Sequence, residues 1–358
     1  MCDKYVIGYW LTERKQRKIN WNEFHKLCES EGFLLKMIDV NSSIESQGPI
    51  HVFIHKLVET LGHADRGDQN AIQIISRLEE YFEQHPEVIV IEPFSRISNL
   101  CNRCRFYELI QEGIQHDDIF TPTTVEIKNN NVAENMSVIK RHGLKFPIVC
   151  KSLYAHGSHD SHKMMIVFNE SGLNDCQPPC VAQTFINHNA IVYKIFVVND
   201  EFHVVERPSL KNFYKEDCAT LNTIFFNSHD INRSGAKSIL SVLSETNIPL
   251  TVKPKYEVLE VIVEKIKEIF GLVLFGVDII IENHTGKYAI LDVNVFPSFD
   301  GYPNFFEDLI QCMRKLVVKQ KGSRQSSKNS ALRKCLSDDL DSGFESDQKK
   351  KSSTKEAD

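Results

Sequence analysis

The sequence predicts an α/β fold that begins with a mostly parallel sheet and continues with two units that mix strands and helices. Over residues 1–100, short apolar runs rich in β-branched residues alternate with segments of helical periodicity, as expected when helices connect parallel strands. Farther along, the apolar runs at 275–281 and 290–297 are predicted to be buried strands. The residues His284-Thr285-Gly286 between these runs suit a hairpin turn.

The predicted elements follow in chain order. In the first unit, strands are expected at 5–10, 33–40, 51–55 and 88–91, and helices at about 21–31 and 69–84. In the second unit, strands are expected near 123–127, 148–151, 164–168 and 181–186. The third unit adds strands at 192–198 and 202–206 to the two acid-bearing runs. Apolar residues at helical spacing predict a helix that stops at Gly271 and a last amphipathic helix over 306–317.

These segments predict three domains and a tail. The N-terminal α/β domain would span residues 1–117, the central domain 118–186 and the C-terminal domain 187–320. Residues 321–358 are rich in Ser, Lys and Asp and poor in apolar residues, so they cannot bury a core and are expected to be disordered. A chain of 358 residues is long enough for two or three domains with substantial cores.

The composition is that of a soluble globular protein, with 42% hydrophobic and 25% charged residues. The net charge of −6 argues against broad nucleic-acid binding, so an anionic ligand would need a local basic cluster. We see no signal peptide and no apolar run of transmembrane length, and we therefore expect a cytoplasmic protein that does not bind membranes.

The ten cysteines are scattered along the chain. Cys101 and Cys104 form a CxxC pattern, and Cys176 and Cys180 form a CxxxC pattern. A zinc site would have to bring the two pairs together from distant parts of the chain. Free thiols in a reducing cytosol are the interpretation we favour, with zinc as the alternative.

Acidic residues lie on both of the buried strands predicted near the C-terminal end. Asp278 lies on the first strand, and Asp292 and Asn294 lie on the second, two residues apart and so on the same face. A buried strand does not hold an acid unless something compensates its charge. Two carboxylates and an amide oxygen on one sheet face suit Mg²⁺. The alternative is a pair of acids at strand ends, either solvated or paired with Lys or Arg.

A candidate phosphate-binding segment lies in the second unit. Lys151 ends a predicted strand, a small polar loop follows at 155–162, and another strand begins at about 164. The Lys151 ammonium and the backbone N–H groups of the loop could hold phosphates, whereas the chain contains neither a GxxxxGK[ST] loop nor the protein-kinase motifs. Two alternatives are a surface hairpin with a solvated lysine and a zinc site formed by the three histidines of the loop.

Basic residues also follow two strands of the first unit. The segment 12–18 comes directly after the first strand, and Lys56 follows the third. Ligands of open parallel sheets bind outside the carboxyl ends of the strands, so these residues predict a polyanion site. Lys194, Arg207 and Lys211 could contribute from the third unit. The alternative is a charge run exposed to solvent.

The order of these pieces resembles the inositol-tetrakisphosphate 1-kinase (inositol-trisphosphate 5/6-kinase) family of ATP-grasp kinases over about residues 4–318. Two motifs are specific to that family, FINHNA within 185–190 and RPSLKNF at 207–213. The other matching segments are GYWL at 8–11, QGPIHVFIHKL at 47–57, FPIVCK at 146–151, the AHGS…SHKM loop at 155–164, FFNSH at 225–229, FGVDIII at 275–281 and LDVNVFP at 291–297.

The resemblance implies a fold and an activity. The fold would be α/β ATP-grasp, with an N-terminal parallel α/β domain followed by two α+β domains that sandwich ATP. The enzyme would transfer the γ-phosphoryl group of ATP, with two Mg²⁺ ions, to a ring hydroxyl of an inositol polyphosphate. The expected acceptors are inositol 3,4,5,6-tetrakisphosphate at position 1 and inositol 1,3,4-trisphosphate at position 5 or 6.

The resemblance also assigns roles to individual residues. It implies that the inositol phosphate is contacted by Lys15, Lys56, His162, Lys194 and Asn294. It implies that ATP is contacted by Arg103, Lys151, Gln183, Phe185, Ile186, Lys194, Ser209 and Ser228, with residues 183–194 forming an adenine strap. The implied magnesium ligands are Asp278, Asp292 and Asn294. His156 and His162 are the expected catalytic helpers at the acceptor.

The chain departs from the family pattern at three places. Ser298 stands where the family usually has Gly, Asn232 stands where a Ser is frequent, and the loop between Gly157 and Ser161 is one residue longer. Two other functions share the fold or its ligands, an ATP-grasp carboxylate–amine ligase and a non-catalytic inositol phosphate sensor.

The tail contains one further motif. Residues 341–346, Asp-Ser-Gly-Phe-Glu-Ser, resemble the DSGxxS phosphodegron that an F-box ubiquitin ligase recognises. Two phosphoserines would present dense negative charge to an arginine-lined pocket. The alternative is a chance match in a tail that is rich in Ser and Asp.

Overall fold

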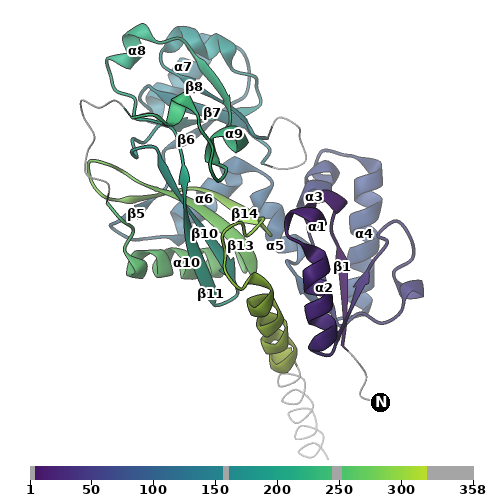
Figure 1. Ribbon diagram of the computed structural model, residues 1–358. Helices are drawn as coiled ribbons and strands as arrows, with labels where there is room; N and C mark the ends of the chain where they lie inside the picture. Colours follow the sequence, from purple (N-terminus) through teal and green to yellow (C-terminus); the bar gives the residue numbers. More distant parts are fainter. Residues whose placement is uncertain (1–4, 156–160, 244–251, 321–358) are drawn as a thin grey trace, which may run out of the picture. The chain divides into compact units, whose positions relative to one another are not determined.

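The computed structural model describes residues 5–155, 161–243 and 252–320. The chain forms two compact units, Met1–Ile310 and Gln311–Asp358, and all three sheets belong to the first (Figure 1). The predicted tail and its motif at 341–346, and also His156 and the rest of the loop up to residue 160, lie outside the described residues. Among the helices that are described, none is long and apolar enough to cross a membrane.

The first sheet is parallel throughout, which confirms the prediction for the N-terminal part. Its order is β2-β1-β3-β4, with β1 at Tyr5–Trp10, β2 at Phe33–Met37, β3 at Val52–His55 and β4 at Ile89–Ile91. The longer helices around it are α2 (Trp21–Ser30), α3 (Val58–Asp65) and α4 (Gln69–Gln84) (Figure 1). Strand β2 stops before the expected Val40 because the chain turns at Asp39, whose carboxylate accepts hydrogen bonds from Asn41 N and Ser42 Oγ.

Several helices were not predicted, among them three short or polar helices near strand ends. Helix α1 (Glu13–Lys18) covers the basic segment after β1, and Thr12 caps it by accepting a hydrogen bond from Lys15 N at 3.2 Å. Helices α5 (Phe94–Ile97) and α6 (Arg103–Gly113) follow β4, with the 3₁₀ turn η2 (Ser98–Leu100) between them. A helix of four or six residues is too short to show a hydrophobic period, so its sequence gives little signal.

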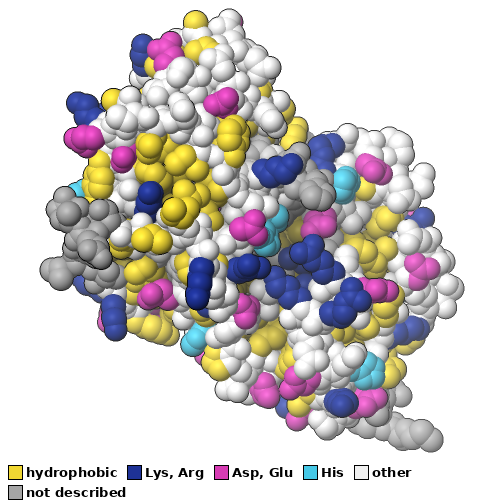
Figure 2. Space-filling model, turned by 45° about the horizontal axis from the view of Figure 1, so that its top comes forward, with side chains coloured by type: hydrophobic (Ala, Val, Ile, Leu, Met, Phe, Trp, Pro, Cys, Tyr) yellow, Lys and Arg dark blue, Asp and Glu magenta, His cyan; other side chains and the backbone are white. Residues whose placement is uncertain are grey.

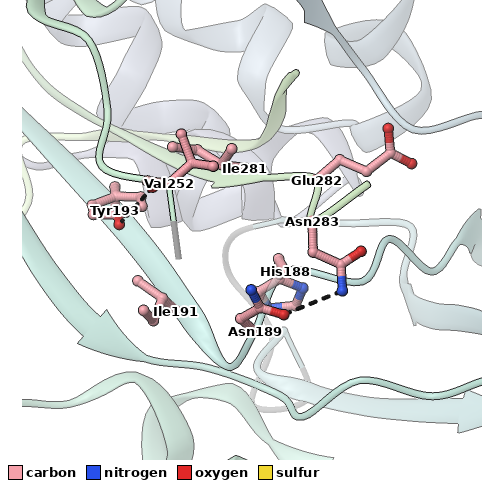
Figure 3. A pocket seen from close by; sticks show the side chains of 8 residues that line it. All are labelled: His188, Asn189, Ile191, Tyr193, Val252, Ile281, Glu282 and Asn283. Atoms are coloured by element: carbon pink, nitrogen blue, oxygen red, sulfur yellow. Dashed lines mark hydrogen bonds between the residues drawn. The ribbon is translucent and has the colours of Figure 1, made fainter. Parts of the chain in front are cut away.

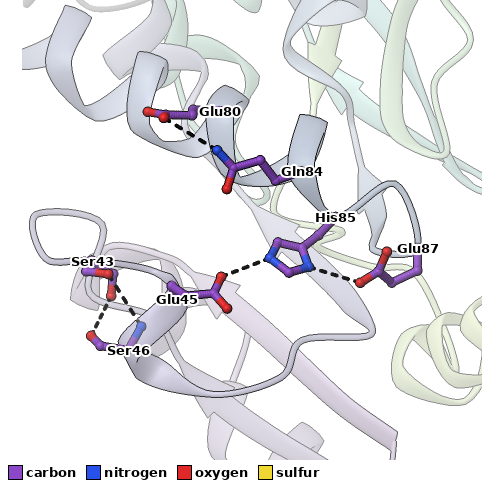
Figure 4. A network of polar contacts seen from close by, with 7 residues as sticks. All are labelled: Ser43, Glu45, Ser46, Glu80, Gln84, His85 and Glu87. Atoms are coloured by element: carbon purple, nitrogen blue, oxygen red, sulfur yellow. Dashed lines mark hydrogen bonds and ion pairs between the residues drawn. The ribbon is translucent and has the colours of Figure 1, made fainter.

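A polar network connects the loop before β3 with the end of α4 beside the first sheet. His85, just after α4, lies between two carboxylates, with Nε2 2.8 Å from Glu45 and Nδ1 3.0 Å from Glu87 (Figure 4). Glu45 belongs to the 3₁₀ turn η1 (Glu45–Gln47). Hydrogen bonds to Glu87 and Glu45 raise the pKa of His85. The network holds the loop before β3 against the end of α4.

The second sheet is antiparallel, with the order β12-β8-β7-β9-β6. Its strands are β6 (Thr124–Ile127), β7 (Ile148–Ser152), β8 (Lys163–Val167), β9 (Cys180–Thr184) and β12 (Ile224–Asn227). Helix α7 (Val132–Arg141) packs on one face through Met136 and Ile139, and the 3₁₀ turn η3 (Glu170–Asp175) packs through Leu173. This core also contains three cysteines, Cys150, Cys176 and Cys180.

The third sheet has the order β11-β10-β13-β14-β5. Its strands are β5 (Ile119–Phe120), β10 (Ile191–Val198), β11 (Glu201–Pro208), β13 (Leu274–Ile281) and β14 (Tyr288–Val295). Helix α10 (Tyr256–Phe270) ends at Gly271 in the left-handed conformation (φ 64°), as predicted, and packs on α6 through the stacked rings of Phe106 and Phe270. The smaller helical elements are α8 (Asp217–Thr220), α9 (Ser228–Asn232) and η4 (Ile239–Ser241), and a last helix starts at residue 305.

Two short strands pair across the boundary that the sequence suggested at residues 186 and 187. Neither strand was predicted. Strand β5, whose residues fall in the predicted central domain, pairs with β14 of the third sheet. Strand β12, whose residues fall in the predicted C-terminal domain, pairs with β8 of the second. Strands of two and four residues show no reliable period, so sequence alone could not place them.

A buried carboxylate joins the N-terminal sheet to the third sheet. Glu92 follows β4 with a positive φ of 69°, and its Oε1 accepts hydrogen bonds from the backbone N of Val273 (2.7 Å) and of Leu274. Its second oxygen, Oε2, is buried without a partner among the described residues. Burial raises the pKa of Glu92 to about 7.

Candidate active site

The three predicted metal ligands lie together on one face of the third sheet. Asp278 and Asp292 are directly opposite each other on the antiparallel pair β13 and β14, and Asn294 is opposite Gly276. A register shift follows Asp278, between it and Ile279. The neighbouring strand β10 places Lys194 opposite Asp278, and Lys194 Nζ lies 2.6 Å from Asp278 Oδ2. The structure therefore brings together two carboxylates, an amide and an ammonium.

Asp292 is subject to opposing electrostatic influences. Burial raises its pKa first of all, and the charge of Asp278 raises it further. The positive charges of Arg103, Lys151 and Lys194 act in the opposite direction and lower it. One carboxylate oxygen accepts a hydrogen bond from the backbone N of Val293 at 3.0 Å. Three cations from three different elements thus act on the same carboxylate.

The donor set of this site fits a hard divalent cation. It consists of oxygen donors alone, two carboxylates and an amide, which are the ligands that Mg²⁺ prefers. Within the described part of the chain, no three His, Cys, Asp or Glu side chains gather as a metal-binding group. The third oxygen donor beside the two carboxylates is the amide of Asn294. Among the described residues the cysteines form no disulfide.

Lys151 is held in place by neutral groups and faces the acidic pair. Its Nζ donates to Gln183 Oε1 at 2.7 Å and to Tyr107 Oη at 3.3 Å. Burial lowers its pKa to about 8, Arg103 adds to this effect, and the charges of Asp292 and Asp278 counteract it. Gln183 Nε2 in turn donates to Thr124 Oγ1 at 2.9 Å. The ammonium is therefore buried, positioned and close to the predicted metal ligands.

Arg103, the first residue of α6, fixes the polar loop of the central domain at both of its described ends. Its guanidinium donates to the carbonyls of Ser152 (2.6 Å) and Tyr154 (3.2 Å) on one side and of Ser161 (3.3 Å) on the other. The preceding Asn102 caps the helix by accepting from Cys104 N at 2.9 Å. Arg103 thus connects α6 with the segment that the sequence predicts to bind phosphate.

Tyr107 belongs to the candidate site and was missed by the sequence analysis. Its hydroxyl donates to the carbonyl of Leu291 at 2.6 Å, directly before Asp292. Tyr107 follows Arg103 by four residues on α6, so the two lie on one face of the helix. That spacing was the available signal, because an aromatic hydroxyl one turn after a candidate phosphate-binding arginine is placed to reach the same site.

The predicted adenine strap, residues 183–194, is rigidly built. His188 Nδ1 donates to Ile186 O at 2.6 Å, and His188 Nε2 accepts from Ser209 Oγ at 2.7 Å. Burial lowers the pKa of His188 to about 4, so the ring is neutral and this pattern of donors fits one tautomer. Phe185 packs against Phe213 with ring centroids 5.3 Å apart. Ser209, a predicted nucleotide contact, is buried and fixes the strap in this conformation.

A small cavity lies behind the strap (Figure 3). Its volume is about 10 Å³, and Asn283 Nδ2 donates across its edge to Asn189 Oδ1 at 3.1 Å. A space of this size holds at most a water molecule. In this conformation the cavity has no room for a nucleotide base.

The two predicted acceptor lysines of the N-terminal domain both reach the segment after β14. Lys15 is buried, donates to the carbonyls of Phe296 (2.9 Å) and Pro297, and lies 4.2 Å from the centre of the Phe296 ring. Lys56 donates to Phe296 O at 3.1 Å. Burial lowers the pKa of both lysines, that of Lys56 to about 8. An ammonium has three donors, so Lys56 keeps more of them for another ligand than Lys15 does.

The remaining predicted residues are divided between the site and its surroundings. His162 directly precedes β8, and its carbonyl accepts a hydrogen bond from Ser228 N at 3.0 Å. The Arg207 guanidinium donates to the backbone carbonyl of Asp300 at 2.7 Å and to the Asp300 carboxylate at 3.1 Å. The Lys211 ammonium lies over the Phe213 ring, 5.7 Å from its centre. His162 and Ser228 are therefore neighbours, whereas Arg207 and Lys211 have local partners of their own.

Comparison with protein families gives two matches. Residues 6–97 match the inositol 1,3,4-trisphosphate 5/6-kinase pre-ATP-grasp domain. Residues 114–315 match the inositol 1,3,4-trisphosphate 5/6-kinase ATP-grasp domain. Together the matches account for most of the described chain.

Curated relatives carry a consistent name. The chain is 38% identical over 324 residues to inositol-tetrakisphosphate 1-kinase of Xenopus laevis, covering 90% of this chain and 81% of that protein. It is also 38% identical to the Danio rerio protein of the same name, over 88% of this chain and 79% of the relative. Inositol-tetrakisphosphate 1-kinase 1 of Zea mays is 28% identical, over 91% of this chain and 93% of the relative.

Solved structures show the ATP-grasp fold. The ATP-grasp ligase PsnB, complexed with minimal precursor, has a TM-score of 0.53 at 10% identity and covers 89% of this chain and 99% of its own. D-alanine–D-alanine ligase from Bacillus anthracis has a TM-score of 0.53 at 12% identity, and the match covers 90% of this chain and 100% of the ligase chain. At such low identity these likenesses establish the fold and not the reaction.

Proposed function

Because the chain belongs to the inositol 1,3,4-trisphosphate 5/6-kinase family, an ATP-grasp family, we propose that it is an ATP-dependent inositol polyphosphate kinase. The acceptors we propose are inositol 3,4,5,6-tetrakisphosphate at position 1 and inositol 1,3,4-trisphosphate at position 5 or 6. The observation that carries this proposal is the meeting of Asp278, Asp292 and Asn294 with the ammonium of Lys194 on one sheet face.

The domain organisation that we propose follows the function. Residues 1–117 would contribute acceptor contacts, and the central and C-terminal domains, 118–186 and 187–320, would bind ATP between their sheets. Asp278, Asp292 and Asn294 would hold two magnesium ions, since their oxygen atoms suit this metal. When bound, the metal supplies neutralisation of the charge on the transferred phosphoryl group.

The chain's own residues would position ATP. Lys151, held by Gln183 and Tyr107, would offer a buried positive charge to the phosphates, and Arg103 would fix the loop that covers them. Phe185 and Ile186 would contact adenine, and Ser209 would act through His188 to keep the strap in shape. Ser228, whose backbone N donates to His162 O, would also contact the nucleotide.

The acceptor would bind on the side of the N-terminal domain. We propose that Lys15, Lys56, His162, Lys194 and Asn294 contact it. Burial and neighbouring positive charges lower the pKa of His162 to about 4, so this ring is neutral near pH 7 and can donate one hydrogen bond and accept another. His156, the other proposed helper, lies outside the described residues. Catalysis would depend mainly on positioning and on charge neutralisation.

Neither alternative function gains support from a specific observation. The ligases among the solved structures share only the fold with this chain, at 10–12% identity. A non-catalytic sensor would not need the two facing carboxylates beside Lys194. A cytoplasmic location and an F-box ligase that reads residues 341–346 also remain proposals from the sequence. Equal cellular half-lives of the wild type and a Ser342→Ala/Ser346→Ala variant would exclude the degron.

A transfer assay tests the proposed function. The purified chain is incubated with γ-labelled ATP, with and without Mg²⁺, and with inositol phosphates, free inositol or D-alanine and other amino acids. We expect label in inositol polyphosphates alone, dependent on the metal, and chromatography of the products identifies the phosphorylated position. ADP release that requires an amino acid, without labelled inositol phosphate, would overturn the proposal in favour of a ligase.

A further inference from the structure

Two histidines from distant parts of the chain are in contact beside the candidate active site. The rings of His162, before β8, and His229, in α9, have centroids 3.8 Å apart and meet edge to face. Two hydrogen bonds fix the arrangement, one from Ser228 N to His162 O (3.0 Å) and one from His229 N to Asn227 Oδ1 (2.9 Å). These hydrogen bonds therefore hold the two histidine rings in contact with each other.

Positive charges surround this histidine pair. Arg103, Lys56 and Arg14 act on His162, and Lys18, Lys194 and Arg14 act on His229. The charge of Asp230 counteracts these cations at His229. Figure 2 shows Lys and Arg side chains gathered near the middle of one face, next to His side chains and Asp or Glu side chains. Such a concentration of cations suits a polyanion.

Helix α1 divides its basic residues between two roles. Lys15 is buried and bound to the carbonyls of Phe296 and Pro297. Arg14 and Lys18 are exposed and lie four positions apart, hence on one face of the helix. Within the described residues neither of these two forms an ion pair, whereas Arg17 pairs with Glu13 at 3.7 Å.

The predicted acceptor residues leave too little positive charge for an inositol tetrakisphosphate. Each phosphate of such an acceptor carries about −1.5 to −2 charges at pH 7. Lys194 is already paired with Asp278, and Lys15 donates two of its hydrogen bonds to main-chain carbonyls. Among the lysines assigned to the acceptor, only Lys56 has most of its donors left. Additional groups must therefore neutralise the phosphates.

We infer that Arg14, Lys18 and His229 complete the acceptor site and bind phosphates of the inositol polyphosphate together with His162. The inference rests on the proposed function and adds residues to it. Arg14 and Lys18 would supply charge from α1, and His229 would supply a ring N–H beside the one of His162. This subsite is separate from Lys151, whose ammonium is bound to Gln183 and Tyr107.

Steady-state kinetics and calorimetry with inositol 3,4,5,6-tetrakisphosphate test the inference. For Arg14→Ala, Lys18→Ala and His229→Phe, we expect the acceptor KM to rise about tenfold, the size of one charge-assisted contact, and the KM for ATP to change by less than about twofold. The Phe variant keeps a ring against His162. The matched control is Arg17→Ala, which removes a cation from the same helix that pairs with Glu13 and is not part of the proposed subsite.

The outcomes separate this inference from the proposed function. A wild type that phosphorylates no inositol phosphate would refute the function. A wild type that does so, with variants that bind the acceptor as tightly as Arg17→Ala does, would refute only the inference. Thermal melting checks the fold of each variant. If His229→Phe melts early, His229→Gln replaces it, and an unchanged acceptor KM in that variant would remove His229 from the site.

Discussion

Lys194 and Asp278 face each other across strands β10 and β13, and their charged atoms Nζ and Oδ2 are 2.6 Å apart. Asp278 in turn faces Asp292 on β14. The side chains of Lys194 and Asp278 are only 20% and 17% exposed. Lys194 therefore compensates one of two carboxylates that would otherwise repel each other across the hairpin.

Replacing Lys194 should make folding depend more strongly on magnesium. Lys194→Met leaves Asp278 and Asp292 facing each other without the ammonium. We expect the free energy of unfolding to fall by about 2 kcal/mol, which lies between the losses typical of an exposed and of a buried ion pair. Urea denaturation in EDTA measures this loss, and added Mg²⁺ should recover part of it. Lys267→Ala breaks the more exposed pair with Asp200 (2.9 Å) and serves as the control. Equal losses in the two variants would contradict this role.

The two lysines that reach Phe296 should behave differently when they are replaced. Lys15→Met leaves the carbonyl of Pro297 without its donor, so we expect mainly a loss of stability, about 2 kcal/mol. Lys56→Met should instead raise the acceptor KM about tenfold and the ATP KM little, because Lys56 has donors left for a phosphate. Melting curves and the two KM values distinguish these effects. An unchanged acceptor KM in Lys56→Met would remove that residue from the site.

The two acid-bearing strands could be predicted, but their partners could not. Asp278 and Asp292 lie on runs joined by a short turn, so the sequence itself implies that they meet. Lys194 reaches Asp278 only because β10 pairs with β13 across 84 residues, and no local pattern records that register. Lys151 likewise finds Gln183 through the pairing of β7 with β9. Resemblance to a family indicated these residues, but their contacts became visible only in the structure.

Glu92 should make stability depend on pH in the opposite sense to a paired carboxylate. Burial raises its pKa from 4.5 to about 7, so the folded state binds a proton that the unfolded state has lost between these values. Its contribution is therefore full below pH 4.5 and declines as the pH rises to 7, by up to about 3 kcal/mol.

Glu92→Gln tests that expectation, because an amide can still accept from Val273 N and cannot ionise. The wild type should lose stability relative to the variant as the pH rises from 5 to 8 in urea titrations. As a control, Glu83→Gln makes the same change at an exposed carboxyl of α4. Parallel stability curves for the wild type and Glu92→Gln would show that Glu92 does not titrate in this range.

Asp292→Asn tests the proposed metal site itself. The change keeps the size of the side chain but removes one of the two facing charges, and kcat should fall more than about 100-fold if this carboxylate holds the metal. Burial and Asp278 both raise the pKa of Asp292, so its charge is costly in the absence of a cation. The variant should therefore melt at the same or a higher temperature without Mg²⁺, and Mg-ATP should stabilise it less than the wild type.

Asp300→Asn, which alters the exposed partner of Arg207, is the matched control and should keep both the activity and the melting shift. Full turnover in Asp292→Asn, together with an undiminished shift on addition of Mg-ATP, would mean that Asp292 is a structural acid and not a ligand.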